Sequence, residues 1–199
     1  MLSAKAIVEL HDQLTRQWHE TPRAEIEGNN AWLKAVALQH RANFDLWHIE
    51  DEARTPDASD AKIADVKRRI DRTNQRRNDL AEELERALLA WLEARGLPNC
   101  DAPLNSESPG LMIDRLSILA LKIYHTGEEV DRADAPSSHA ELNRGRIEIL
   151  KEQRGDLANC LDALWADVLG GRRRFKHYRQ LKMYNDPELN PAIYGKNRG

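Results

Sequence analysis

The sequence predicts an all-α fold: a bundle of about five helices, followed by an ordered C-terminal tail rich in basic and aromatic residues. Apolar residues recur at three- and four-residue spacing in five successive segments, the period of an amphipathic helix. Glycine, proline and capping residues separate these segments. No run alternates apolar and polar residues for long enough to form a strand. We expect residues 1–171 to form the bundle and residues 172–199 to form a tail packed on it.

Each of the first three helices ends at a recognisable stop signal. The first is expected over about residues 3–18. The second covers about residues 30–54 and ends before Pro56, because a residue that precedes proline avoids the α region. The third and longest covers about residues 60–95. It stops at Gly96, since glycine readily adopts the left-handed conformation that closes a helix.

The fourth and fifth helices begin at capping residues. Ser108-Pro109 predicts the N-cap and first turn of a helix that runs to about residue 130. This helix is apolar nearly all round, which indicates a central position in the bundle. Ser138 and Glu141 have the spacing of a capping box and are expected to open the fifth helix, which ends at Gly170 and Gly171.

Composition excludes several classes of protein. Charged residues make up 32% of the chain, and Gly and Pro together occupy only 18 positions, so a low-complexity chain is excluded. No apolar run approaches the roughly 18 residues of a membrane span, and the N-terminus lacks the apolar segment of a signal peptide. The two cysteines form no CxxC pair and suit a reducing compartment. These features predict a cytoplasmic protein.

The net charge of −3 conceals an asymmetry. Residues 172–199 contain eight Lys or Arg against Asp186 and Glu188, which gives the tail a charge of +6 and the rest of the chain −9. The tail also holds three of the four tyrosines. We therefore expect it to fold back, with residues 182–186 covering polar residues of the bundle; a tail exchanged within a homo-oligomer is the alternative. Interleaved basic and aromatic residues also suit nucleic acid, but the acidic body argues against that partner.

Polar residues interrupt the apolar faces of four predicted helices. Burying such groups without partners would cost a few kcal/mol each, about 1–3 by mutational measures, so they either line a groove or form a satisfied internal network. We expect them to converge on one bundle-centred site, because bundles build ligand sites from inward side chains of facing helices. These positions are His48, Glu50, Asp51 and Arg54 in the second helix, Asp71, Asn74, Arg77 and Asn78 in the third, Arg115, Lys122 and His125 in the fourth, and Gln153 and Arg154 in the fifth.

Several strings resemble an uncharacterised bacterial family, the domain of unknown function DUF4254: LWHIEDEAR, IDRTNQRRND, SPGLMIDRLSILALKIYH, EQRGDL and KMYNDPELNP. The resemblance covers the second to fifth helices and the tail. It points to nearly the same polar positions and adds Lys182, Tyr184 and Asn185. It also implies a genomic setting beside heptosyltransferase-type glycosyltransferases of cell-envelope polysaccharide synthesis.

Metal chemistry is only partly supported by the residue pattern. A di-iron bundle needs Glu-x-x-His pairs, which the helices lack. A zinc site needs three or four His or Cys ligands, whereas only His48 and His125 are well placed, and Cys160 is expected in the core. Glu50, Asp51 and Asp71 are similar to the Mg²⁺ ligands of MazG-type nucleotide pyrophosphatases, although Asn74 stands where the last acid belongs. Under that hypothesis His48 and the three acids are the catalytic groups.

The remaining polar residues favour anion binding. Arginine forks suit phosphate, and amides suit the hydroxyl and carbonyl groups of sugars or bases. Glu50, Asp51 and Asp71 would balance the cations of an empty site. The predicted ligand is a phosphorylated sugar or nucleotide sugar, held by the cations and amides named above. The alternatives are an adaptor for a glycosyltransferase and a Mg²⁺-dependent pyrophosphohydrolase; the residues do not identify a cofactor.

Overall fold

A bundle of five helices accounts for nearly all of the chain that the structure describes, a computed structural model covering residues 2–26, 30–179 and 188–189. The predicted all-α class is confirmed, with each helix ending within a few residues of the expected position. None of the described helices is both long enough and apolar enough to cross a bilayer. The helices are α1 (Ala4–Glu20), α2 (Ala31–Glu52), α3 (Asp60–Glu93), α4 (Pro109–Val130) and α5 (Ser137–Leu169).

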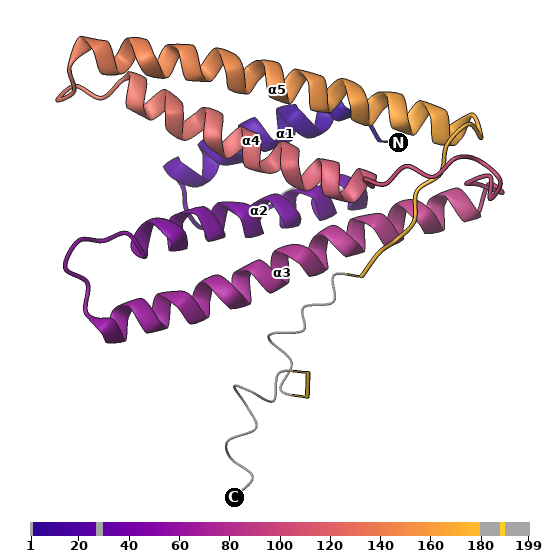
Figure 1. Ribbon diagram of the computed structural model, residues 1–199, viewed down its shortest axis with the longest axis horizontal. Coiled ribbons are helices and arrows are strands. Elements are labelled where there is room, and N and C mark those ends of the chain that lie inside the picture. Colours follow the sequence, from indigo (N-terminus) through magenta and orange to yellow (C-terminus); the bar gives the residue numbers. More distant parts are fainter. Residues whose placement is uncertain (1, 27–29, 180–187, 190–199) are drawn as a thin grey trace, which may run out of the picture.

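The helices form two long hairpins with α1 beside them (Figure 1). One hairpin joins α2 to α3 and the other joins α4 to α5; α4 contacts all four other helices. This confirms the central position expected from its apolar surface. The hairpins converge where α3 ends and α4 begins, and they splay apart towards the α2–α3 and α4–α5 turns (Figure 1). Arg115 and Lys122 of α4 are exposed, and this part of α4 positions the candidate site.

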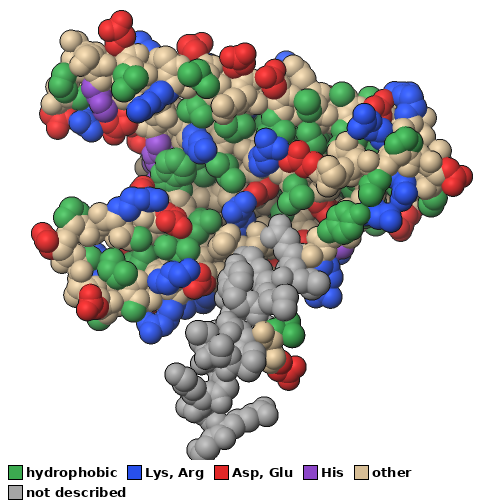
Figure 2. Space-filling view, in the orientation of Figure 1, with side chains coloured by type: hydrophobic (Ala, Val, Ile, Leu, Met, Phe, Trp, Pro, Cys, Tyr) green, Lys and Arg blue, Asp and Glu red, His purple; other side chains and the backbone are tan. Residues whose placement is uncertain are grey.

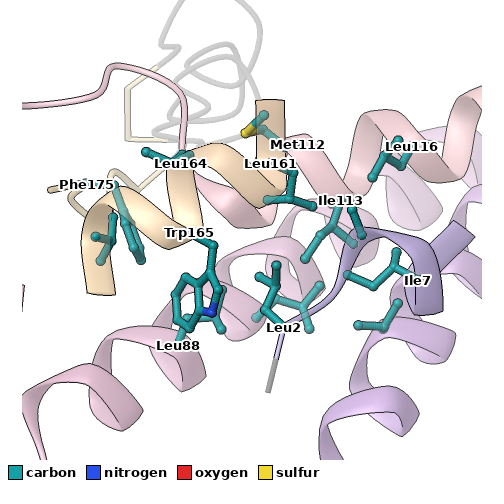
Figure 3. Packing of buried hydrophobic residues seen from close by; sticks show 14 of the residues in the cluster. Leu2, Ile7, Leu88, Met112, Ile113, Leu116, Leu161, Leu164, Trp165 and Phe175 are labelled. Atoms are coloured by element: carbon teal, nitrogen blue, oxygen red, sulfur yellow. The ribbon is translucent and has the colours of Figure 1, made fainter. Parts of the chain in front are cut away.

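The main hydrophobic core fills the converged end of the bundle. Leu88 of α3, Ile113 of α4 and Trp165 of α5 meet there, with Ile7 from α1 (Figure 3). Each fully buried aliphatic side chain of this size stabilises the fold by about 1.5–3 kcal/mol. A second cluster, around Trp18, Phe44 and Leu121, joins α1, α2 and α4 nearer the splayed end. Both clusters contain residues of α4, so α4 is packed against its neighbours at two levels of the bundle.

Capping explains most helix starts and corrects one prediction. Ser108 Oγ accepts a hydrogen bond from the backbone N–H of Leu111, as the Ser108-Pro109 pattern predicted. The capping box expected at Ser138 is wrong: α5 starts at Ser137, its N-cap is Pro136, and no side chain caps it. The physical reason is that Pro136 (φ −59°, ψ 152°) itself sets the extended entry, so that Ser138 lies inside the first turn.

The chain after α5 returns along the bundle as far as residue 179. Gly171 has φ +68° and reverses the chain. The backbone N–H of Asn105 then donates to the carbonyl oxygen of Arg174 at 2.7 Å, and the N–H of Arg174 donates to the carbonyl oxygen of Pro103 at 3.1 Å. Phe175 is buried in the main core. His177 contacts the carboxylate of Glu85 at 3.2 Å. Residues 182–186, which were expected to cover polar residues of the bundle, lie outside the described residues.

Candidate functional site

A buried polar network surrounds the carboxylate of Asp114, at the middle of the bundle. Arg77 of α3 donates to both carboxylate oxygens, from Nε at 2.9 Å and from Nη2 at 2.5 Å. Two amides of α2 also donate to Oδ1, Gln39 at 2.5 Å and Asn43 at 2.9 Å. The hydrogen bonds that Arg77 donates to Asp114 raise the pKa of Arg77. Since Asp114 is only 5% exposed, these donors satisfy a charge that would otherwise be costly to bury.

His40 extends this network to α1. Its Nδ1 accepts a hydrogen bond from Ser117 Oγ at 2.7 Å, and Ser117 Oγ accepts one from Asn43 at 2.9 Å. Its Nε2–H donates to the carbonyl oxygen of His11 at 3.1 Å and lies 3.0 Å from Thr15 Oγ1. Burial lowers the pKa of His40 to about 3 and the pKa of His11 well below its usual value. Both rings are therefore neutral at physiological pH, and they stack with centroids 4.4 Å apart.

Two adjoining cavities lie along α4 and meet at Ile118; together we call them the α4 groove. The cavity between α4 and α5 measures about 590 Å³, and the cavity between α2, α3 and α4 about 490 Å³. Lys and Arg side chains stand among apolar ones in the recess between the two hairpins (Figure 2). Each cavity falls within the usual size of a small-molecule site, about 300–1,000 Å³.

The α4 groove brings together many of the predicted site residues. Those that line it are Glu50, Asp51, Arg54 and Arg77 in the smaller cavity, and Arg115, Lys122 and Gln153 in the larger. Cys160 also lines the larger cavity and is exposed, so its expected place in the core is wrong. The reason is that α5 buries only a narrow apolar stripe around Leu157 and Leu161 there.

Most charges in the α4 groove are paired. Arg54 lies 3.2 Å from Asp51 and 3.6 Å from Glu50, so these acids do balance a cation, as expected. Arg115 binds Glu107 at 2.7 Å. Lys122 is exposed and, among the described residues, has no acidic partner. The groove thus contains one cation that makes no ion pair in the described structure, with the carboxylate of Asp156 lining the same cavity.

Two predicted residues are engaged away from the α4 groove, so the expectation of one site that includes them is wrong. Asp71 lies 2.5 Å from Lys67, one turn earlier on the exposed part of α3. Arg154 binds Asp12 of α1 at 2.6 Å, because α5 packs against α1 at this level. Glu50, Asp51 and Asp71 do not form a three-ligand carboxylate cluster in the described structure. The geometry therefore gives no support to the arrangement expected of a Mg²⁺-dependent pyrophosphohydrolase.

The other predicted residues have separate positions. Asn74 accepts a hydrogen bond from Arg77 at 3.4 Å and so supports the Asp114 network. Asn78 is buried within α3. His48 and His125 lie together at the splayed end, and His19 of α1 joins them. Three predicted residues lie outside the described part of the chain: Lys182, Tyr184 and Asn185.

His19, His48 and His125 form a cluster that we call the histidine trio. Their ligand atoms all lie within 4.8 Å of one another, and in the described residues no other group of His, Cys, Asp or Glu has a spacing that suits a metal. Burial, and the neighbouring His19 and His125, lower the pKa of His48. Trp47 lines the smaller cavity of the α4 groove and stacks on His125 with centroids 4.7 Å apart. The trio is therefore next to the groove.

Comparison with known proteins gives a family but no activity. Residues 33–177 match the family model described as "Protein of unknown function (DUF4254)". The matched segment contains the Asp114 network from α2 to α4, the α4 groove, His48 and His125, and it excludes His19. No curated protein and no solved structure matches the chain. Because the match covers well over half of the sequence, the chain belongs to the DUF4254 family.

Proposed function

We propose that the α4 groove binds a phosphorylated small molecule, a sugar phosphate or a nucleotide sugar. The observation that carries the proposal is Lys122, an exposed cation in the larger cavity with no acidic partner among the described residues. Arg115 lies seven residues earlier, hence on the same face of α4, with Ile118 between them. This pair presents two cations beside an apolar floor, which suits a phosphate attached to a larger group. The carboxylates of Glu107, which pairs with Arg115, and of Asp156 line the same cavity and balance the two cations when no ligand is bound.

The rest of the groove supplies groups that suit a sugar or base. Gln153 faces the same cavity from α5 and offers both a donor and an acceptor. In the smaller cavity Trp47 provides an aromatic surface, and Glu50 and Asp51 provide acceptors for hydroxyl groups. Arg54 pairs with both acids and balances one of their two negative charges, and all three residues line the smaller cavity rather than the cavity that contains Lys122. We therefore place the phosphate in the larger cavity and the uncharged part of the ligand towards Trp47.

The two cysteines provide a test with an internal control. Both are free and exposed, but only Cys160 lines the α4 groove. Full-length protein is treated with a thiol reagent in the presence of sugar 1-phosphates, nucleotide sugars or inorganic pyrophosphate, and mass spectrometry of proteolytic peptides gives the modification rate of each cysteine. A ligand in the groove is expected to slow modification of Cys160 severalfold and to leave Cys100 unchanged.

Two lysine variants decide whether such protection comes from the proposed site. Lys122→Ala should weaken the ligand by roughly tenfold or more, because a charge-assisted contact to phosphate is lost. Lys151→Ala is the matched control: Lys151 is an exposed lysine of α5 that binds Glu148 and does not line the groove. The proposal is rejected if none of these compounds protects Cys160, or if Lys122→Ala binds the protecting compound as tightly as the wild type.

A second candidate function, an adaptor for a glycosyltransferase, is favoured by one observation on α5. Leu142 and Ile149 are 56% and 57% exposed and lie seven residues apart on the same side of the helix. Exposed aliphatic residues in such a pair suit a protein partner more than a small anion. A double change, Leu142→Arg with Ile149→Arg, should abolish co-purification with a co-expressed glycosyltransferase and leave Cys160 protection intact.

A further inference from the structure

Three helices that are remote in sequence bring the histidine trio together. His19 lies in the last turn of α1, His48 near the end of α2 and His125 in the second half of α4. Their ring centroids are 5.1–5.6 Å apart, and each pair of rings is steeply inclined. Rings inclined in this way do not stack face to face, and one nitrogen atom of each ring lies within 4.8 Å of a nitrogen of the other two.

Hydrogen bonds determine which nitrogen carries the proton in two of the rings. His19 Nδ1 lies 2.7 Å from the carbonyl oxygen of Thr15, and a carbonyl can only accept. His125 Nδ1 lies 2.7 Å from the carboxylate of Glu128. Both Nδ1 atoms therefore donate, and both Nε2 atoms carry a free lone pair. This is the tautomer that metal-binding histidines commonly adopt, held by a carbonyl or carboxylate behind the ring.

The two lone pairs have no partner in the described structure. The Nε2 atoms of His19 and His125 are buried and make no hydrogen bond. Each of these buried acceptors lacks a donor, and the trio has one nitrogen of each ring within 4.8 Å of the others, so a positive ion bound among the rings would satisfy both lone pairs. The ring of His48 completes the third side.

Aromatic side chains hold the trio in place. Tyr124 stacks on His19 with centroids 4.2 Å apart, and Trp47 stacks on His125. Phe44 contacts the rings of both His19 and His48 through its edge or face. An apolar shell of this kind fixes ring orientation and excludes water, both of which strengthen metal coordination.

We propose that His19, His48 and His125 bind a divalent transition-metal ion of the zinc type. Three neutral imidazoles suit Zn²⁺ and do not suit Mg²⁺ or Ca²⁺, which prefer oxygen ligands. A tetrahedral zinc ion with Zn–N bonds of about 2.05 Å needs ligand nitrogens roughly 3.3 Å apart, so each nitrogen moves inward by less than about 1 Å. Since no fourth His, Cys, Asp or Glu joins the group in the described residues, the fourth position is left to water or a ligand.

The metal proposal stands apart from the phosphate proposal, because it is tested with metal alone. Full-length, tag-free protein is stripped with a chelator and titrated with Zn²⁺ in competition with a chromophoric chelator; Co²⁺ is then used as a spectroscopic probe. We expect one equivalent of Zn²⁺ to bind and four-coordinate Co²⁺ to give intense visible absorption. His48→Gln and His125→Gln should each weaken Zn²⁺ binding by more than about 100-fold, with helical circular dichroism retained.

Two further variants separate this site from adventitious binding. Glu128→Gln should weaken Zn²⁺ by about 10-fold, because the carboxylate that orients His125 is lost. His139→Gln is the matched control, since His139 binds Glu129 and is not part of the trio. The proposal is overturned if the wild type binds less than one equivalent, or if His48→Gln and His125→Gln bind Zn²⁺ as tightly as the wild type. Equal losses in His139→Gln would also overturn it.

Discussion

At the scale of single residues, Asp114 holds the polar interior together. Its carboxylate accepts hydrogen bonds from Arg77, Gln39 and Asn43, which belong to two different helices. A buried ion pair adds little stability relative to apolar packing, but removing one partner is expensive because the other charge and donors lose their acceptor. Asp114 therefore orients Arg77, whose guanidinium also lines the smaller cavity of the α4 groove.

Replacing Asp114 tests this role. Asp114→Ala should lower the free energy of unfolding by about 3–5 kcal/mol, since it leaves Arg77 and two buried amides without their acceptor. Urea unfolding followed by circular dichroism measures the change. Asp71→Ala removes the same side chain from an exposed pair and should cost at most about 0.5–1 kcal/mol. Equal losses in the two variants would contradict the proposed role of the network.

Sequence patterns indicate which residues are unusual, but not which residues meet. The polar positions of α2, α3 and α4 can be recognised in the sequence because they interrupt an apolar period. Most of them do line the α4 groove or belong to the Asp114 network. His19 and His40 could not be assigned in this way, because their partners depend on how α1 crosses α2 and α4. Asp71 was misplaced for a related reason: Lys67 is available one turn earlier and holds it on the exposed part of α3.

At the scale of helices, the approach of α4 to α3 depends on a missing side chain. A Cβ atom at Gly110 would lie 2.5 Å from Glu85 Cγ and 2.8 Å from the backbone oxygen of Ala81. Glu85 is itself buried, with its pKa raised by burial, and it accepts a hydrogen bond from Ser108. The first turn of α4 therefore packs directly on α3, and the backbone of α3 cannot yield without separating the two helices.

The same substitution at two glycines of α4 should have opposite effects. Gly110→Ala should destabilise the protein by about 1–3 kcal/mol through overpacking. Gly127→Ala has nothing within 4 Å of its new Cβ and should stabilise by about 0.5–1 kcal/mol, because alanine loses less backbone freedom in a helix. Thermal unfolding of both variants measures the difference. A stabilising Gly110→Ala would show that α3 and α4 are not in close contact there.

Helix ends were the most predictable part of the fold, because their signals are local. Ser108 caps α4 as expected, and Gly96, with φ +69°, closes α3. The start of α5 was misassigned because both Pro136 and Ser138 can precede a helix. Pro136 comes earlier in the chain and is the N-cap. The way in which the two hairpins pack against each other is not determined by local signals. The α4 groove is lined by residues of α2, α3, α4 and α5 that are remote in sequence, and no short pattern encodes how these helices meet.

At the scale of the whole molecule, stability should fall in mild acid because two histidines are buried in neutral form. His40 has its pKa lowered from 6.5 to about 3 by burial, and His11 is lowered in the same direction. In the unfolded chain both take up a proton near pH 6.5, so between about pH 6.5 and pH 3 the unfolded state binds more protons. The contribution of these two histidines to the free energy of unfolding therefore has its full value above pH 6.5 and decreases as the pH falls below it.

The slope of the free energy of unfolding against pH is the measurable quantity. Each neutral histidine contributes up to about 1.4 kcal/mol per pH unit below pH 6, since one proton is taken up on unfolding. Besides burial, His40 and Arg154 both lower the pKa of His11. Within the described residues, the ring of His40 contacts His11, Ser117, Thr15 and the ring of Trp18. His40→Gln should unfold at lower urea at pH 7.5, because packing is lost, yet show a shallower decline between pH 6 and pH 5. An unchanged slope in His40→Gln would mean that this histidine is protonated in the folded protein, and the hydrogen-bond pattern that places its only proton on Nε2 would then be wrong.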